Sequence, residues 1–207
     1  MKELGFFGVP RVPAVVVGDR VVHGWDPKGL AELVGIVYEE AEKIPPEELG
    51  RLLDTILGAA LRAVRQLTDD QLNLKTPGRN RSVRQLGYHI FRVAKSYPDA
   101  IEQGYLSEKW FEEDPPTGFD RIESIAGYGR MVRENLAEWL KRHGTLIGNV
   151  NTYYGSQSVY DFFERTVWHT AQHLRQLYAM LETAGIHPDD PLAEADLKGL
   201  PLPKNLW

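Results

Sequence analysis

The segment 158–184, SVYDFFERTVWHTAQHLRQLYAMLETA, decides how the rest of the chain is interpreted. We predict one long helix here that ends before Gly185, because glycine readily adopts the left-handed conformation in which many helices end. Within it, His169 and His173 stand four residues apart. This spacing places both imidazole rings on one face of the helix, with Cβ atoms roughly 5–6 Å apart, so each ring can direct a nitrogen at one metal ion.

Three further helices are predicted upstream of this segment. From Glu47 to Leu67, aliphatic residues recur with the period of an amphipathic helix. Ser82 and Gln85 have the spacing of a capping box, which marks the start of the next helix. We expect the helices at about 47–67, 82–103, 121–143 and 158–184, with a loop at 144–155 and a tail from residue 188 that wraps over the surface.

Four helices of this length, joined by connections of mixed length, predict a mainly α protein built as an antiparallel four-helix bundle. We expect this unit, together with its tail, to span residues 45–207. The composition agrees, because 43% apolar and 26% charged residues are typical of a globular protein with a sizeable core.

The first 44 residues have a different character. Val15, Val16 and Val17 belong to a β-branched run that predicts a buried strand, and Gly18-Asp19 predicts a hairpin turn into a second strand that ends at His23. Asp26 and Pro27 then mark the start of a helix that we expect to reach about Lys43. A small β-hairpin plus one helix offers too little core to fold alone, so residues 1–44 must pack against the rest of the chain or a second copy.

Composition excludes several classes of function. A net charge of −5 argues against nucleic-acid binding, and no apolar run reaches the length of about 18 residues needed to cross a membrane. The first residues lack the pattern of a signal peptide, so we expect a cytoplasmic protein. The chain has no cysteine, which excludes disulfides and Cys-ligated metals. Histidine or carboxylate must hold any metal, and any reacting thiol must come from a substrate.

His89 offers a third imidazole. It lies among apolar residues near the middle of the second predicted helix, so we expect it to face inwards. Three neutral imidazoles from two facing helices leave coordination positions open, as in catalytic metal sites. The alternative is that the pair on the last helix is purely structural. Zinc and nickel are the metals expected first, and iron(II) also accepts imidazole. We interpret the other histidines as structural or solvated: His23, His143 and His187.

Polar residues near the three histidines are candidates for orienting the rings or binding a substrate. Gln85 and Arg92 lie one turn from His89, and Gln172 lies beside His173. Tyr153 belongs to a polar, aromatic loop just before the last helix and is a candidate for covering the site. Arg165, Thr166 and Gln176 also lie one turn from the ligands, and helical geometry sends half of such neighbours to solvent. No residue is assigned a catalytic role from the sequence.

From about residue 47 to the end, the chain resembles the DinB-like superfamily of bacterial four-helix-bundle proteins. The resemblance rests on the segments 81–89, RSVRQLGYH, and 169–177, HTAQHLRQL. Members typically hold one divalent metal with three histidines, one from the second helix and an HxxxH pair from the last. The resemblance therefore implies that His89, His169 and His173 are metal ligands, and it also implies a homodimer that pairs through helix faces.

Residues 4–42 resemble the second half of a glutaredoxin. The resemblance rests on segments 8–19, GVPRVPAVVVGD, and 22–26, VHGWD. It implies that Pro13 is the cis-proline beside a thiol site, that Val12 pairs with a bound thiol peptide, and that Gly24 and Asp26 lie where glutathione's carboxylate meets a helix start. The family's first strand, first helix and cysteine motif have no counterpart here. Glutaredoxin redox activity is therefore not expected, and the segment serves either packing or thiol recognition.

Three functions remain open from the sequence. Several DinB-like proteins resemble metal-dependent thiol S-transferases, in which a low-molecular-weight thiol loses its proton at the metal and attacks an electrophilic small molecule. The second function is that of a non-catalytic, metal-stabilised dimeric interaction module. The third is a metal-dependent hydrolase, which the absence of a carboxylate within one turn of the histidines disfavours, since Asp161 and Glu164 lie further along the last helix.

Overall fold

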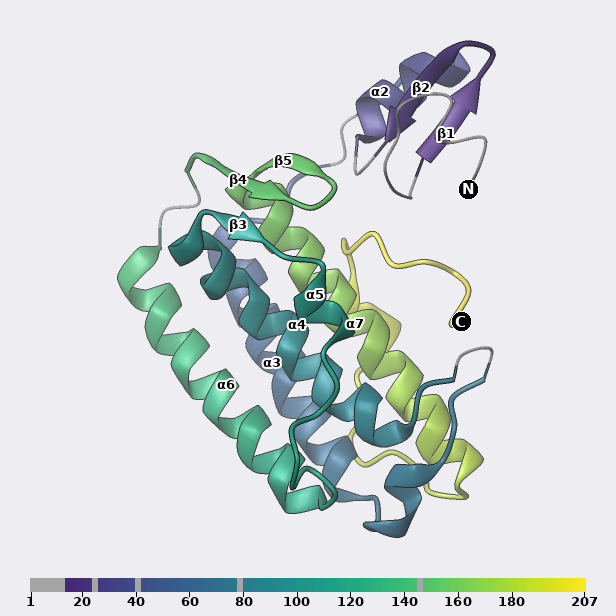
Figure 1. Ribbon diagram of the computed structural model, residues 1–207, viewed down its shortest axis with the longest axis vertical. Coiled ribbons are helices and arrows are strands. Elements are labelled where there is room, and N and C mark those ends of the chain that lie inside the picture. Colours follow the sequence, from purple (N-terminus) through teal and green to yellow (C-terminus); the bar gives the residue numbers. More distant parts are fainter. Residues whose placement is uncertain (1–13, 24–25, 40–41, 78–79, 145–146) are drawn as a thin grey trace.

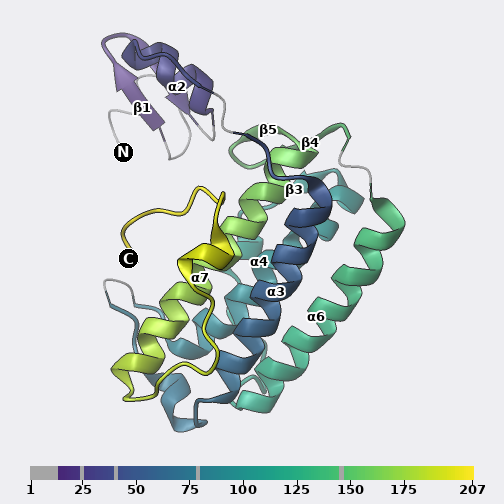
Figure 2. The same cartoon turned by 180° about the vertical axis from the view of Figure 1, so that it is seen from behind.

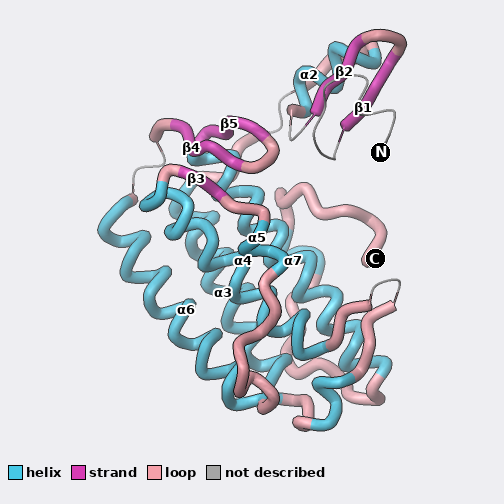
Figure 3. Tube along the Cα trace, in the orientation of Figure 1, coloured by secondary structure: helices cyan, strands magenta, loops and turns pink. Residues whose placement is uncertain are grey.

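The computed structural model describes residues 14–23, 26–39, 42–77, 80–144 and 147–207. Helices account for most of this structure, and a small β-hairpin precedes them (Figures 1 and 3). The mainly helical class predicted from the sequence is confirmed. Four long helices dominate: α3 (Pro46–Arg65), α4 (Val83–Gln103), α6 (Ile122–His143) and α7 (Val159–Thr183).

Local signals in the sequence set the boundaries of these helices. The predicted capping box starts α4: the Gln85 amide donates to Ser82 Oγ at 3.2 Å, and the Ser82 amide donates to Gln85 Oε1 at 2.7 Å. Ser158 caps α7 by accepting from the Asp161 amide at 3.0 Å. Gly185 follows α7 with a φ of 75°, as expected for a glycine just beyond a helix end.

The order in which the helices pack differs in part from the prediction. Both α3 and α4 pack against α6 and against α7. Helices α3 and α7 run in one direction, and α4 and α6 run in the other (Figure 1). The predicted antiparallel pairing is therefore seen for α4 with α7 and for α3 with α6, whereas α3 with α7 and α4 with α6 are parallel neighbours.

The parallel pair α4 and α6 has a simple covalent cause. Residues 104–121 run back along the helices between the end of α4 and the start of α6, through β3 (Tyr105–Leu106) and the short helix α5 (Lys109–Glu112) (Figure 1). An extended chain spans up to about 3.3 Å per residue, whereas a helix rises only about 1.5 Å per residue. A connection of this length can therefore span a helix of similar residue count. The connection therefore brings the chain back to the end from which α4 started.

Large aromatic side chains fill the core between the four helices. Tyr97, Phe162 and Phe163 are almost fully buried, and the Tyr97 ring centroid lies 4.5 Å from that of Phe163. Phe91 is also fully buried, and it packs where α6 approaches α4 at Gly129. Side chains of this size supply most of the apolar area that stabilises a core.

A small sheet closes one end of the four helices. Strands β4 (Asn149–Thr152) and β5 (Gly155–Ser158) form an antiparallel hairpin, and β3 pairs with β4 in parallel. The prediction of an irregular loop over 144–155 is wrong here. These strands are too short and too polar to show the alternation by which strands are recognised.

The N-terminal unit confirms the predicted hairpin and helix start but not their extent. Strands β1 (Ala14–Val17) and β2 (Arg20–His23) pair in antiparallel register, and the Gly29 amide donates to Asp26 Oδ1 at 2.8 Å at the start of α2 (Pro27–Val34). The helix ends at Gly35, whose φ of 75° stops it well before Lys43. The predicted buried strand is exposed, since Val15, Val16 and Val17 are each more than one third accessible.

The tail runs back along α7, as Figure 2 shows. Gln66 Nε2 donates to the His187 carbonyl at 2.9 Å, and Leu197 and Leu200 are buried against the helices. Two short 3-10 helices complete the described structure: η1 (Asp70–Asn73) and η2 (Glu194–Leu197). No helix in the described part of the chain is long and apolar enough to cross a membrane. The predicted division at residues 44 and 45 stays a prediction.

Two glycines of α6 give a matched test of this packing. A Cβ on Gly129 would lie 2.5 Å from the buried Phe91 ring, whereas a Cβ on Gly127 meets nothing within 4 Å. We expect Gly129→Ala to lower the free energy of unfolding by about 1–3 kcal/mol through overpacking. Gly127→Ala should instead raise it by up to about 1 kcal/mol, because alanine favours the helix. Urea denaturation of both variants checks this, and equal effects would contradict the described contact between α4 and α6.

Candidate metal centre

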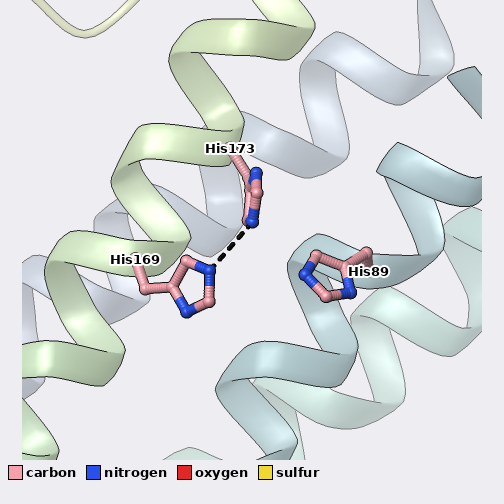
Figure 4. A group of neighbouring side chains, drawn as sticks. All are labelled: His89, His169 and His173. Carbon is pink, nitrogen blue, oxygen red and sulfur yellow. Dashed lines mark hydrogen bonds between the residues drawn. The ribbon is translucent and has the colours of Figure 1, made fainter. Parts of the chain in front are cut away.

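The packing of α4 against α7 brings three histidines together. His89 comes from α4, and His169 and His173 come from successive turns of α7. Each offers one ring nitrogen, and these three atoms lie within 4.8 Å of one another. Figure 4 shows the rings meeting in the space between the two helices. The structure therefore contains the three-histidine group that the sequence predicted.

The spacing of the rings suits a single metal ion. His169 Nε2 and His173 Nε2 are 3.0 Å apart, and the ring centroid of His89 lies 4.7 Å from that of His173. A tetrahedral ion with metal–nitrogen distances of about 2.0–2.1 Å holds its ligand nitrogens roughly 3.3 Å apart. The separation of 3.0 Å between His169 and His173 is close to that distance. A site with three protein ligands would leave one tetrahedral position for a substrate.

Burial keeps the site in the form that binds metals. His89 and His173 are each only 5% exposed, and His169 is partly buried. Burial, followed by the nearby His173 and Arg165, holds the pKa of His169 well below its usual value near 6.5. His169 is therefore neutral at physiological pH, as an imidazole ligand must be.

Gln172 and Gln176, on the same helix, both contact the C-terminal tail. Gln172 Nε2 donates to the Leu206 carbonyl at 2.8 Å, so the side chain of this predicted site residue binds the tail. Gln176 Oε1 lies 2.7 Å from His173 Nδ1 and is the direct partner of a candidate ligand. From the sequence, Gln176 is only one polar neighbour among several, because helical spacing alone does not show which glutamine reaches the ring.

The polar candidates on α4 hold a neighbouring segment in place. Gln85 belongs to the capping box, and its Nε2 also donates to Asp114 Oδ1 at 2.6 Å. Arg92 is buried, and its Nε donates to Glu113 Oε2 at 2.9 Å. Both residues therefore fix the stretch that follows α5, which makes them supports for the surroundings of the site.

Phe111, an aromatic residue of α5 that was not predicted from the sequence, lies against the histidines just before that stretch. Its ring centroid lies 6.1 Å from that of His89, 5.7 Å from that of His169 and 6.2 Å from that of Tyr153. Tyr153 thus reaches the site through Phe111, from the turn between β4 and β5. The adjacent Trp110 and Phe111 were the available signal, since an aromatic pair beside a proline break suggests a packed segment.

The remaining predicted residues lie elsewhere or outside the description. Asp26 caps α2, whereas Val12, Pro13 and Gly24 lie outside the described residues. His143 stacks on Trp139 at the end of α6, with ring centroids 4.3 Å apart, which agrees with a structural role. Thiol recognition by residues 12–26 stays a prediction.

A family comparison covers this site. The model of the DinB superfamily matches residues 52–177, which include all three histidines and span more than half of the chain. The chain belongs to the DinB superfamily. No curated protein matches it. The superfamily match begins after the N-terminal unit, so the resemblance of residues 4–42 to a glutaredoxin stays a prediction about this DinB protein.

The lowered pKa of His169 predicts how stability depends on pH in metal-free protein. The unfolded chain binds a proton at this residue near pH 6.5, whereas the folded chain resists protonation until the pH is lower. The free energy of unfolding should therefore fall as the pH drops below about 6.5, by at most about 1.4 kcal/mol per pH unit from this residue. Urea denaturation between pH 8 and pH 5 should show a shallower loss for His169→Gln, and identical slopes would contradict the burial of this ring.

Proposed function

We propose that this DinB protein is a metal-binding four-helix bundle in which His89, His169 and His173 hold one divalent ion. The observation that supports this most directly is the meeting of three imidazole nitrogens, within 4.8 Å of one another, at a buried helix interface. Buried polar groups at such an interface are costly unless they are paired. Zinc and nickel suit an all-imidazole site best, and iron(II) is next.

We further propose that the protein is a thiol S-transferase. When bound, the metal would supply the positive charge that lowers the pKa of a coordinated low-molecular-weight thiol. The sulfur would then form a bond to an electrophilic carbon, the leaving group would depart with the electron pair of its bond, and the thiol proton would pass to solvent. The nucleophile must arrive with a substrate, because the chain has no cysteine.

The chain's own residues provide surroundings that suit this chemistry. Phe111 and Tyr153 form an aromatic wall beside the imidazoles, which would limit the access of water. Arg165 lies one turn before His169, and its guanidinium carbon sits 4.3 Å from the ring centroid of Tyr154. This cation would favour a substrate that carries negative charge near the site.

Hydrolysis is the less favoured chemistry, because three candidates for a general base have other partners among the described residues. Glu164 accepts a hydrogen bond from Tyr160, and Asp161 lies 3.6 Å from Lys43 Nζ. Glu113 is paired with Arg92. A hydrolase would need a carboxylate beside the metal to activate water.

A non-catalytic dimeric module is the second candidate, and the N-terminal unit favours it. Apolar residues on β1, on α2 and just beyond it are exposed, including Val34, Ile36 and Val37. Exposed apolar residues gathered on one small unit suit an interaction site, which a second copy of the chain would cover. This candidate predicts a homodimer whose metal only stabilises the fold.

Metal content tests the first proposal. Protein purified without chelator and without a nickel affinity column should carry about one zinc, nickel or iron per chain by elemental analysis. His169→Ala and His173→Ala should lose it. His143→Ala is the matched control, because His143 stacks on Trp139 at the end of α6 and should leave the content unchanged. Wild-type protein that neither carries metal nor gains melting temperature with added zinc would refute the site.

Thiol consumption tests the proposed reaction. Metal-loaded protein should accelerate the loss of free thiol in the presence of electrophiles by at least 10-fold over metal-free protein and over His169→Ala, since both lack the ion. Cobalt-substituted protein should also develop a sulfur-to-metal absorption band when thiol alone is added. Bound metal and a dimer without any thiol turnover would favour the interaction module, and turnover of esters without thiol would favour the hydrolase.

A further inference from the structure

The C-terminal tail reaches the metal centre through two buried glutamines of α7. Gln172 Nε2 donates to the carbonyls of Asn205 and Leu206, at 3.2 and 2.8 Å. Gln176 Nε2 donates to the same Leu206 carbonyl at 2.7 Å. Both glutamines are less than one tenth exposed, so these bonds have little competition from water.

The Leu206 carbonyl determines how the Gln176 amide is oriented. A carbonyl oxygen can only accept, so the amide must present its nitrogen to Leu206. Its oxygen, Oε1, then faces His173 Nδ1 at 2.7 Å. An amide oxygen also can only accept, so His173 Nδ1 must carry the proton that is shared with it.

This arrangement determines which nitrogen of His173 can coordinate a metal. In a neutral imidazole protonated at Nδ1, the lone pair is on Nε2. His173 Nε2 is the atom that lies 3.0 Å from His169 Nε2 inside the three-histidine group. Without metal, His169 Nε2 is then the donor in that contact.

Arg175 holds the tail against the helix on the adjoining side. Its Nη1 donates to Gln172 Oε1 at 2.7 Å and to the Pro203 carbonyl at 2.9 Å. The two ends of the Gln172 amide therefore bind Arg175 and the tail, so Gln172 cannot rotate without breaking several bonds. Residues 203–206, which we name the tail segment, are thus fixed at three carbonyls: Pro203, Asn205 and Leu206.

We propose that the tail segment is a part of the metal centre, in which the Leu206 carbonyl acts through Gln176 to fix the tautomer and orientation of His173. The inference rests on the proposed function, since it takes His173 as a metal ligand. Gln176 is a positioning residue on this account, and the tail segment selects Nε2 of His173 as the coordinating atom. Partners of this kind typically change metal affinity by about 10- to 100-fold.

The tautomer can be measured directly in metal-free protein by nitrogen-15 NMR of the histidine side chains at about pH 8. Wild-type His173 should be protonated at Nδ1. Gln176→Leu, which removes both hydrogen bonds of the amide, should shift the ring towards a mixture of tautomers. Gln66→Leu is the matched control, because Gln66 also binds the tail, at His187 and Asp189, but far from the ring. It should leave the tautomer unchanged.

Two truncations separate the tail segment from the glutamine. A chain that stops after Leu206 keeps an acceptor there, as the terminal carboxylate, and should retain both the tautomer and the metal affinity. A chain that stops after Lys204 loses the Asn205 and Leu206 oxygens. It should bind zinc about 10-fold or more weakly in a competition titration, as should Gln176→Leu. Circular dichroism of each variant shows whether the fold is kept.

The outcomes distinguish this inference from the proposed function. Wild-type His173 protonated at Nε2, or a tautomer unchanged in both Gln176→Leu and the chain ending at Lys204, would overturn the inference even if the protein binds zinc. Equal zinc affinity in folded wild type and both variants would overturn it as well. A wild type that binds no metal but has His173 protonated at Nδ1 would refute the proposed function, while the effect of the tail segment on the tautomer would stand.

Discussion

The contact between α4 and α7 is the interaction on which the site depends. It buries His89 and His173, which are each only 5% exposed. Burying such polar rings costs free energy unless each ring nitrogen finds a partner. His173 meets that requirement with Gln176 on one nitrogen and His169 on the other. Both partners lie on α7 itself, and the packing of α4 against α7 adds the third imidazole, His89.

Around this contact, polar residues act by holding other parts of the chain against it. Gln85 and Arg92 bind the stretch directly after α5, and Phe111 of α5 lies beside the imidazoles. Gln172 and Gln176 bind the tail segment on α7. Two segments that are far apart in the sequence thus converge on the same three rings, so the site depends on contacts from much of the chain.

The N-terminal unit buries less of its apolar surface than the four helices do. Its hairpin and α2 are formed by local turn and capping signals, yet several of its valines remain exposed. A small unit with exposed valines gains little stability from burial of its own core. The exposed apolar residues of this unit are the structural feature that supports the proposed homodimer.

The sequence by itself determined the four long helices, the capping box at Ser82 and the pair His169 and His173, because these follow from local spacing. Residues that are four positions apart lie on the same face of α7, and this holds for any segment that packs against that face. Only the tertiary structure decided that α3 and α7 run in parallel, that Phe111 lies beside the histidines and that Gln176 is the partner of His173. These features depend on contacts between residues distant in sequence, such as Gln176 and Leu206, and local spacing contains no information about which distant segments meet.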